Sequence, residues 1–177
     1  MKITNTKEKF IYFITGGSGV GKTTLINNLK NRNKSNSWLF YHFDSIGVPS
    51  LEIMIEEYGS PSKWQEAKTN EWIEKLVDIN HTSVIIFEGQ VNLEFIKQGF
   101  AKYNFKNFKI ILIDCSSEVL ADRLINKRKE PHLVNDNMYN WLNYLRNQAV
   151  SMGATIIDTT TLNDNEVLKK MEEILVY

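Results

Sequence analysis

The sequence has little of several features that would point to other classes of protein. It contains one cysteine, Cys115, so no internal disulfide can form, which fits a reducing compartment. Lysine plus arginine and aspartate plus glutamate both number 21, so the formal net charge is zero. A protein that holds nucleic acid by its phosphates normally needs an excess of basic residues. The charge balance argues against that class, although a local basic pocket stays open.

Long hydrophobic runs are also missing. Segments such as Val84–Phe87 and Ile110–Ile113 are far too short to cross a bilayer. Residues 1–9 are polar and lack the apolar core of a secretory signal. A chain of 177 residues defaults to one domain. We therefore expect a single cytoplasmic domain over residues 1–177, with no membrane partner.

Short apolar segments alternate with longer helical patterns. Five of them are apolar on both faces and rich in β-branched and aromatic residues, namely residues 10–14, 38–41, 84–87, 108–113 and 154–157. Strands of a parallel sheet covered by helices have this character. With helical spacing in the gaps, the order is β-α-β-α-α-β-α-β-α-α-β-α. This alternation predicts an α/β fold with a doubly wound sheet.

A glycine-rich segment follows the first predicted strand and opens the first predicted helix. Residues 16–23 read Gly-Gly-Ser-Gly-Val-Gly-Lys-Thr and match G-x-x-x-x-G-K-[ST] in full. Such glycines let the backbone N–H groups point at phosphate oxygens, and the helix adds its partial positive charge. The segment predicts a P-loop that binds a nucleoside triphosphate, which we take to be ATP, with Mg²⁺. A glycine turn that binds nothing is the weaker alternative.

Each P-loop residue has an expected role. Lys22 reaches the β- and γ-phosphates, the Thr23 hydroxyl coordinates Mg²⁺, and Thr24 touches the α-phosphate. The backbone that cradles the phosphates comes from Gly16, Gly17, Ser18, Gly19, Val20 and Gly21.

Two motifs of GTPases occur only in part. Asp44–Gly47 spells D-x-x-G but follows the second predicted strand, about twenty residues after the P-loop. Asn126–Lys129 begins N-K but lacks the aspartate that reads guanine. We interpret both as chance matches.

Carboxylates end two of the predicted strands. Asp44 follows the second strand, at the edge where α/β sheets place ligands. It could accept the proton of a substrate hydroxyl or hold Mg²⁺ through water, and the alternative is a turn or helix cap. Glu88 ends the third strand, where a second carboxylate of the metal site belongs, and His42 could line a substrate pocket.

A basic segment follows the fourth predicted strand. Arg123 and Arg128 lie on a predicted helix that ends before Pro131. A mobile lid over residues 123–136 could present these arginines to the transferred phosphoryl group. The plainer alternative is a solvated helix end that complements the helix dipole. Given the P-loop, we favour the lid, and Arg146 is a weaker candidate for the same role.

Together these residues resemble a known group, the small P-loop kinases that act on shikimate, gluconate or nucleoside monophosphates. The P-loop, Trp38–Asp44, Asp122–Arg128 and Ile156–Thr159 carry the resemblance, which is nearest to chloramphenicol phosphotransferase. It implies a three-layer P-loop NTPase fold with a five-stranded parallel sheet of order 2-3-1-4-5, helices on both faces and a short lid.

The same resemblance implies roles for individual residues. Asp44 would be the base that deprotonates the acceptor hydroxyl, and the loop after Asp158, with Thr159, would lie near the adenine. Residues 87–90, Phe-Glu-Gly-Gln, depart from the pattern of nucleoside monophosphate kinases. Residues 49–79 match none of these kinases, so we expect them to set the acceptor.

The leading hypothesis is an ATP-dependent phosphotransferase with a small-molecule acceptor. Lys22, Asp44, Arg123 and Arg128 would be catalytic, with Thr23, Asp44 and Glu88 at the metal. One alternative is a nucleotide-binding switch, non-enzymatic or with slow hydrolysis, that acts through a protein partner. Another is a kinase of polynucleotide ends, which the neutral charge disfavours.

Overall fold

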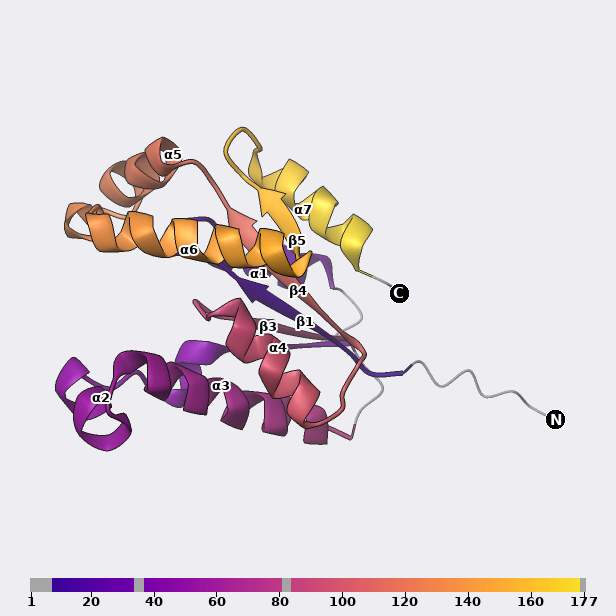
Figure 1. Cartoon of the computed structure of the whole chain (residues 1–177). Coiled ribbons are helices and arrows are strands. Elements are labelled where there is room, and N and C mark those ends of the chain that lie inside the picture. The colour runs from indigo at the N-terminus through magenta and orange to yellow at the C-terminus, as the bar shows by residue number, and fades with distance from the viewer. Residues whose placement is uncertain (1–7, 34–36, 81–83, 176–177) are drawn as a thin grey trace. The chain divides into compact units, whose positions relative to one another are not determined.

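The computed structural model describes residues 8–33, 37–80 and 84–175 (Figure 1). Its strands are β1 (Phe10–Thr15), β2 (Trp38–His42), β3 (Val84–Glu88), β4 (Phe108–Asp114) and β5 (Thr155–Asp158). Its α-helices are α1 (Lys22–Arg32), α2 (Leu51–Tyr58), α3 (Pro61–Asp78), α4 (Leu93–Lys102), α5 (Ser117–Asp122), α6 (Asp136–Met152) and α7 (Asp164–Ile174). Two short 3₁₀-helices, η1 (Phe43–Ile46) and η3 (Pro131–Leu133), and a π-helical turn, η2 (Arg123–Lys127), lie between them.

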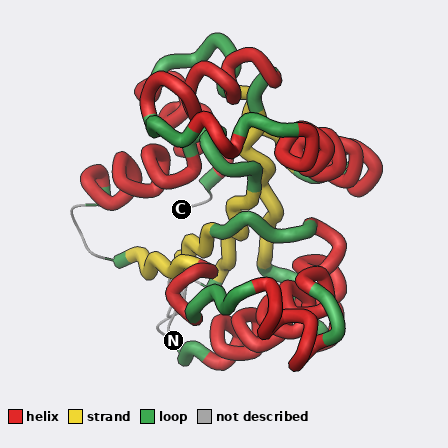
Figure 2. Tube along the Cα trace, turned by 90° about the vertical axis from the view of Figure 1, so that its left-hand side faces the viewer, coloured by secondary structure: helices red, strands yellow, loops and turns green. Residues whose placement is uncertain are grey.

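The predicted alternation of strands and helices is confirmed, and Figure 2 shows it along the trace. The five strands are parallel and follow the order β2-β3-β1-β4-β5, as the resemblance implied. In register, His42 of β2 pairs with Glu88 of β3, and Asp114 of β4 pairs with Asp158 of β5. Because these are the last residues of parallel strands, each pair of polar side chains meets at the carboxyl edge of the sheet.

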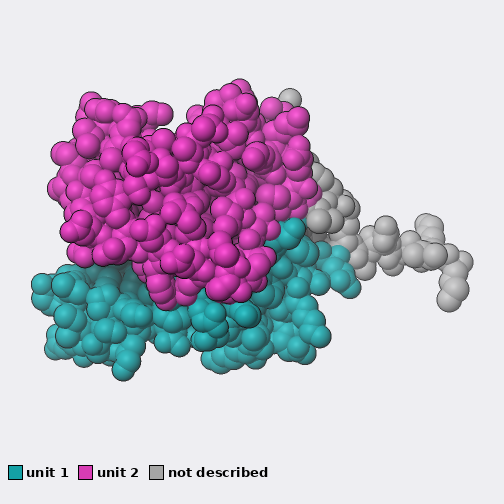
Figure 3. Space-filling model, turned by 45° about the horizontal axis from the view of Figure 1, so that its top comes forward, with its two compact units in different colours: residues 1–13, 35–109 teal, residues 14–34, 110–177 magenta. Residues whose placement is uncertain are grey.

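The chain divides into two compact units, coloured separately in Figure 3. Unit 1 comprises residues 1–13 and 35–109, and α3 packs against both α2 and α4 within it. Its core is aromatic: the ring of Phe87 lies 4.6 Å from that of Phe13 and 5.0 Å from that of Trp72. Phe43 meets Phe87 edge to face, so η1 is anchored to β3.

Unit 2 comprises residues 14–34 and 110–177. Here α1 packs against α7, and β4 pairs with β5. Helix α6 supplies Leu142, Leu145 and Ala149 to the core. The P-loop and the basic segment after β4 both belong to this unit.

No helix in the part of the chain that the structure describes is long and apolar enough to cross a membrane. Residues 1–7, which carry most of the argument against a secretory signal, lie outside the described residues.

Candidate functional site

The predicted P-loop connects β1 to α1 in unit 2. Its backbone approaches strand β4 closely at Gly16, where an added Cβ would lie 2.4 Å from the Ile113 carbonyl oxygen. Only glycine fits that approach, because the neighbouring atom belongs to a buried strand and cannot move aside. The glycine at this position therefore seats the loop on β4.

The N-terminus of α1 differs from those of the other α-helices in the described chain. Side chains cap all the others, from Ser50 on α2 to Asn163 on α7. On α1 the N-cap is Gly21, which makes no side-chain cap, and the first turn carries no acidic residue. Its N–H groups and dipole are therefore suited to an anionic ligand such as a phosphate.

Lys22 directs its ammonium group back onto the loop. The Nζ atom donates to the carbonyl oxygens of Gly16, at 2.9 Å, and Gly17, at 2.8 Å. These bonds hold the positive charge at the loop, where the motif predicted it. Thr23 and Thr24 are exposed on the first turn of α1, so their hydroxyls are accessible to a ligand.

Arg123 ties the P-loop to the end of β5. Its guanidinium donates to the Val20 carbonyl at 3.0 Å, and to the hydroxyl and carbonyl oxygens of Thr159, both at 2.9 Å. Thr159 is buried, and its hydroxyl also lies within hydrogen-bond distance of the Asp114 carbonyl. The contacts of Arg123 are thus with backbone and hydroxyl groups that shape the loop.

The helix after β4 widens by one residue at η2. The sequence predicted a continuous helix, but α5 ends at Asp122 and the Arg128 N–H bonds to the Arg123 carbonyl at 3.0 Å, an i→i+5 bond. In an α-helix, residues five apart point about 140° away from each other. The π-type bond makes them neighbours on successive turns, and such turns often occur at functional sites.

Arg128 consequently faces the same loop as Arg123. Its Nη1 donates to the Ser18 hydroxyl at 2.8 Å, while its Nε lies 2.6 Å from a carboxylate oxygen of Glu130. Three cations therefore contact the P-loop: Lys22 binds the carbonyls of Gly16 and Gly17, Arg123 binds that of Val20, and Arg128 binds the Ser18 hydroxyl. A continuous α-helical register would have separated the two arginines.

Arg146, the weaker candidate for binding phosphates, forms a charged pair that the sequence did not predict and that supports the end of β4. Arg146 on α6 binds the buried Asp114 carboxylate through two nitrogens, at 2.6 and 3.1 Å, and donates to the Cys115 carbonyl at 3.0 Å. The hydrogen bond and charge of Asp114 raise the pKa of Arg146. A charged residue that ends a buried strand was the available signal, but only the fold reveals its partner.

Asp158, expected near a nucleotide base, ends β5 and is exposed. The Thr160 hydroxyl and N–H both bind its carboxylate, and these bonds lower the pKa of Asp158. The carboxylate fixes the turn that holds Thr159 in place.

Asp44 and Glu88, the predicted carboxylates, both belong to unit 1. Asp44 is exposed on η1. The backbone of this turn is fixed by a hydrogen bond from α3, in which Trp72 Nε1 donates to the Phe43 carbonyl at 3.1 Å. Glu88 is largely buried, and its Oε1 lies 2.8 Å from Nδ1 of His42. Gly89 lets η1 approach β3, since an added Cβ would lie 2.4 Å from Phe43 Cβ.

Within the part of the chain that the structure describes, no group of three or more His, Cys, Asp or Glu side chains could hold a metal ion. Mg²⁺ in phosphoryl-transfer sites commonly takes one or two protein ligands and completes its shell with substrate phosphates and water. The exposed Thr23 hydroxyl beside the P-loop fits that kind of site.

Solved structures of small-molecule kinases and of an antibiotic resistance protein share this fold. The shikimate kinase of Acinetobacter baumannii, solved with shikimate, aligns over 95% of this chain and 93% of its own, with a TM-score of 0.63 and 13% identity. The gluconokinase of Sinorhizobium meliloti 1021 aligns over 91% and 88%, with a TM-score of 0.64 and 14% identity. The tunicamycin resistance protein of Deinococcus radiodurans aligns over 96% and 98%, with a TM-score of 0.66 and 18% identity.

A comparison of the sequence with curated proteins gave no significant match. The sequence profile of a family described as AAA domain matches residues 13–142, which is more than half of the chain and includes the whole P-loop. The resemblance to small P-loop kinases is thus confirmed in the fold, and the chain belongs to the AAA domain family.

Proposed function

We propose that the protein is an ATP-dependent phosphotransferase that moves the γ-phosphate of Mg-ATP to a small-molecule acceptor. The observation that carries this proposal is the convergence of Lys22 and Arg128 on the P-loop beside a helix N-terminus without a side-chain cap. Cations and N–H groups fixed around a phosphate site stabilise the charge that spreads over the transferred group. A loop that only held a nucleotide would not need an arginine brought to it by a π-helical turn.

The nucleotide is assigned to residues 16–24, with Asp158 and Thr159 on the base side. When bound, Mg-ATP supplies the phosphoryl group, and its metal neutralises charge on the phosphate oxygens. Thr23 is the proposed protein ligand of the metal. Lys22 orients the β- and γ-phosphates, and Arg128, in the proposed lid over residues 123–136, binds the transferred group. Arg123 acts through the Val20 carbonyl and Thr159, by holding the loop in shape.

Asp44 is the proposed general base. Its carboxylate is exposed, and its backbone is fixed by the contacts of Phe43 with Trp72 and Phe87. An ionised carboxylate held in this way can accept the acceptor's hydroxyl proton as the oxygen attacks phosphorus. Glu88, held by His42, supports the metal through water or orients the attacking group.

The acceptor is proposed to be a small molecule, handled in the cytoplasm. Zero net charge disfavours a polynucleotide, whose backbone would require a basic channel. The fold neighbours include proteins named for shikimate, gluconate and tunicamycin, so this architecture accommodates chemically different partners.

The test is ADP formation from Mg-ATP across a panel of nucleosides, nucleotides, sugars, hydroxylated antibiotics and short oligonucleotides. One class should raise turnover well above the basal rate, and Asp44→Asn should lower that turnover by about a hundredfold or more. Asp164→Asn, an exposed aspartate on α7, is the matched control and should leave turnover unchanged. Tight ATP binding with no stimulation by any acceptor would instead favour a nucleotide switch with a protein partner.

A further inference from the structure

The segment that follows Asp44 exposes an unusual amount of apolar surface. Val48, Leu51 and Ile55 are 56%, 55% and 52% exposed, and Ile53 is 41% exposed. Single exposed apolar residues are ordinary on a protein surface, but a cluster within eight residues marks a binding surface. Elsewhere in the described chain, the exposed large apolar residues are scattered over α6, β5 and the π-helical turn.

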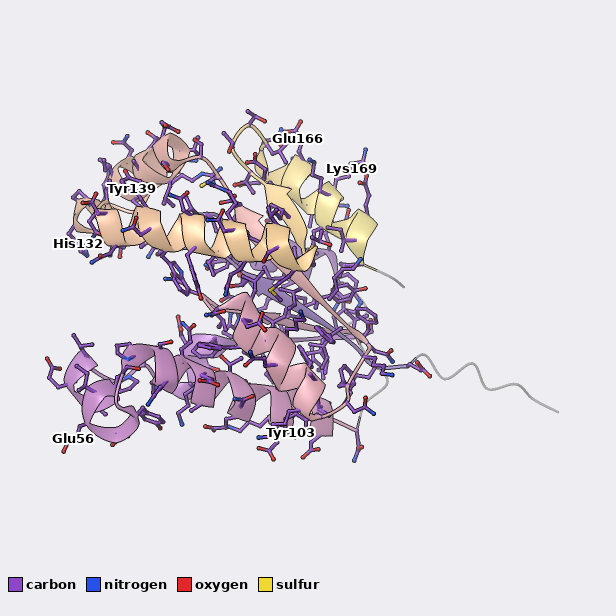
Figure 4. The ribbon with its side chains drawn as sticks, viewed as in Figure 1. Glu56, Tyr103, His132, Tyr139, Glu166 and Lys169 are labelled. Carbon is purple, nitrogen blue, oxygen red and sulfur yellow. The ribbon has the colours of Figure 1, made fainter. Side chains whose placement is uncertain are left out.

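Helix α2 arranges this surface in stripes. Leu51 and Ile55 are one turn apart and share a face, whereas Met54 is the buried residue of the helix. Glu52 and Glu56, also one turn apart, form the next stripe round the helix, and Glu56 projects away from α2 in Figure 4. The Ser50 hydroxyl lowers the pKa of Glu52, so that carboxylate stays ionised at neutral pH. An apolar stripe thus runs beside an anionic one.

No cation balances these carboxylates within the segment. Residues 43–62 contain Asp44, Glu52, Glu56 and Glu57, and no lysine, arginine or histidine. On the neighbouring α3, Lys68 is paired with Glu71 at 2.8 Å. Lys63 lies beside Gly59, at the end of α2 remote from Asp44. Lys68 also lies 5.9 Å from the ring of Tyr58, the last residue of α2. Both lysines thus lie at the C-terminal end of the helix, and an anionic acceptor such as a sugar acid would meet carboxylates and no cation within residues 43–58.

We propose that the acceptor is an amphipathic hydroxyl compound that carries a protonated amine and no anionic group. This rests on the proposed phosphotransferase function and names its substrate class. The apolar body lies on Val48, Leu51 and Ile55, the amine faces Glu52 and Glu56, and the hydroxyl reaches Asp44. The acceptor oxygen forms a bond to the γ-phosphorus while the bond to the β–γ bridging oxygen breaks. ADP leaves with that electron pair, and the hydroxyl proton passes to Asp44 and then to solvent.

The size of the surface favours a small molecule over a protein. A helix of eight residues is about 12 Å long, and one of its faces was used to bury Met54. A stable protein interface needs about 800 Å² on each partner, far more than such a stripe offers. A compound with an apolar body of ten or so carbon atoms matches the length of the stripe.

Three probes that differ only in charge test the proposal. They are 10-aminodecan-1-ol, decane-1,10-diol and 10-hydroxydecanoate, which share a chain and a terminal hydroxyl and are cationic, neutral and anionic at pH 7. Each is titrated into the full chain, below the concentration at which it aggregates, while NMR follows the methyl groups of Val48, Leu51 and Ile55. The cationic probe should shift these methyl signals and bind at least about tenfold more tightly than the anionic one.

Variants separate the two stripes. The double variant Leu51→Ser, Ile55→Ser should weaken the binding of all three probes. The double variant Glu52→Gln, Glu56→Gln should remove most of the preference for the cationic probe over the anionic one. Val150→Ser and Glu173→Gln are matched controls, exposed on α6 and α7, and should change neither affinity nor preference. Equal or tighter binding of the anionic probe would overturn the proposal, as would unshifted methyl signals. If sedimentation showed a dimer in the wild type and a monomer in Leu51→Ser, the stripe would be an interface with a second copy of the chain. That result would also overturn the proposal.

Failure of this inference is distinguishable from failure of the proposed function. If an anionic acceptor were phosphorylated and this activity depended on Asp44, the phosphotransferase function would be supported and the proposed substrate class would be wrong. Binding of the cationic probe without phosphorylation of any bound acceptor would reject the phosphotransferase, and with it the role of the stripe as an acceptor site.

Discussion

The cations beside the P-loop in unit 2 are hydrogen-bonded to the protein, whereas the proposed base in unit 1 is exposed to solvent. In unit 2 the side chains around the P-loop are bonded into the protein itself: Lys22 to loop carbonyls, Arg123 to Val20 and Thr159, and Arg128 to Ser18. In unit 1 the proposed base Asp44 is exposed, and so is most of α2 after it. Beneath Asp44 the backbone is held by the aromatic contacts of Phe43, and Glu88 in the same unit is held by His42.

This difference matches the two tasks of a phosphotransferase. A triphosphate presents the same oxygens in every enzyme that uses it, so its site can be built once from backbone and fixed cations. An acceptor varies from one enzyme to the next, so exposed side chains on a short helix such as α2 are suited to the proposed acceptor site, because they can change without disturbing a core. Variants in the two units should therefore fail differently.

Removal of Lys22 should have the largest effect on activity. Lys22→Ala deletes the ammonium group held on the Gly16 and Gly17 carbonyls, and should lower kcat/KM by about a thousandfold. The thermal midpoint should change little, because Lys22 contributes nothing to the apolar core. Lys30→Ala, exposed on the same helix, is the control. Near-normal turnover in Lys22→Ala would contradict a role for the P-loop in phosphoryl transfer.

Removal of the Arg128 side chain should cost about a hundredfold in kcat. Arg128→Ala deletes the guanidinium that the π-helical turn brings to Ser18, while Arg123 keeps its contacts with Val20 and Thr159. Because the loop itself stays intact, ADP affinity should fall far less than kcat, which calorimetry and turnover measure separately. Lys127→Ala, exposed in the same turn, is the control. Equal losses in both variants would assign the effect to the turn rather than to the Arg128 guanidinium.

The sequence predicted the fold and the phosphate site for different reasons. The strands were visible because they are apolar on both faces, and the P-loop because its residues are consecutive, so spacing alone defines it. The strand order came from family resemblance, and the structure confirmed it. Local patterns were sufficient wherever the structure itself is local.

The features that the sequence did not predict depend on distant residues or on a change of register. Asp114 and Arg146 lie 32 positions apart and meet only in the folded protein. The widened turn at Arg123–Lys127 has the same hydropathy as an α-helix, so no periodicity reveals it. Leu51 and Ile55 have the spacing of a buried stripe, yet they are exposed. The roles of the individual site residues stay predictions, from Lys22 and Thr23 in the P-loop to Asp44, Glu88 and the arginines.

Two glycines compare the units directly, because each would place a new Cβ 2.4 Å from a neighbouring atom. In Gly16→Ala the neighbour is the carbonyl oxygen of Ile113 in a buried strand, so the free energy of unfolding should fall by about 3 kcal/mol. Nucleotide affinity should also fall at least about tenfold. In Gly89→Ala the neighbour is the Cβ of the buried Phe43, so η1 must move as a whole to make room, and the free energy of unfolding should fall by about 2 to 3 kcal/mol. Movement of η1 displaces Asp44, and turnover should fall while nucleotide affinity holds. Equal losses of affinity would contradict the comparison.

The smallest effect concerns burial rather than activity. Burial raises the pKa of the Cys115 thiol to about 11, at the end of β4 in unit 2. Since the thiolate is the reactive form, iodoacetamide at pH 8 should alkylate Cys115 at least about a hundredfold more slowly than an exposed cysteine. A matched reporter for unit 1 is Ser45→Cys, exposed beside Asp44, in a chain that also carries Cys115→Ala.

The same shift fixes the sign of a pH dependence. The folded pKa of Cys115 lies above its unfolded value, so the buried thiol favours folding fully below that unfolded value, near 8.5. This advantage is lost as the pH rises toward about 11. The wild type should therefore lose stability relative to Cys115→Ala between these limits, with turnover at pH 7 unchanged in both. Rapid alkylation of Cys115 in the folded protein would show that water reaches the end of β4, and the contrast between this buried strand end in unit 2 and the exposed Asp44 segment in unit 1 would then fail.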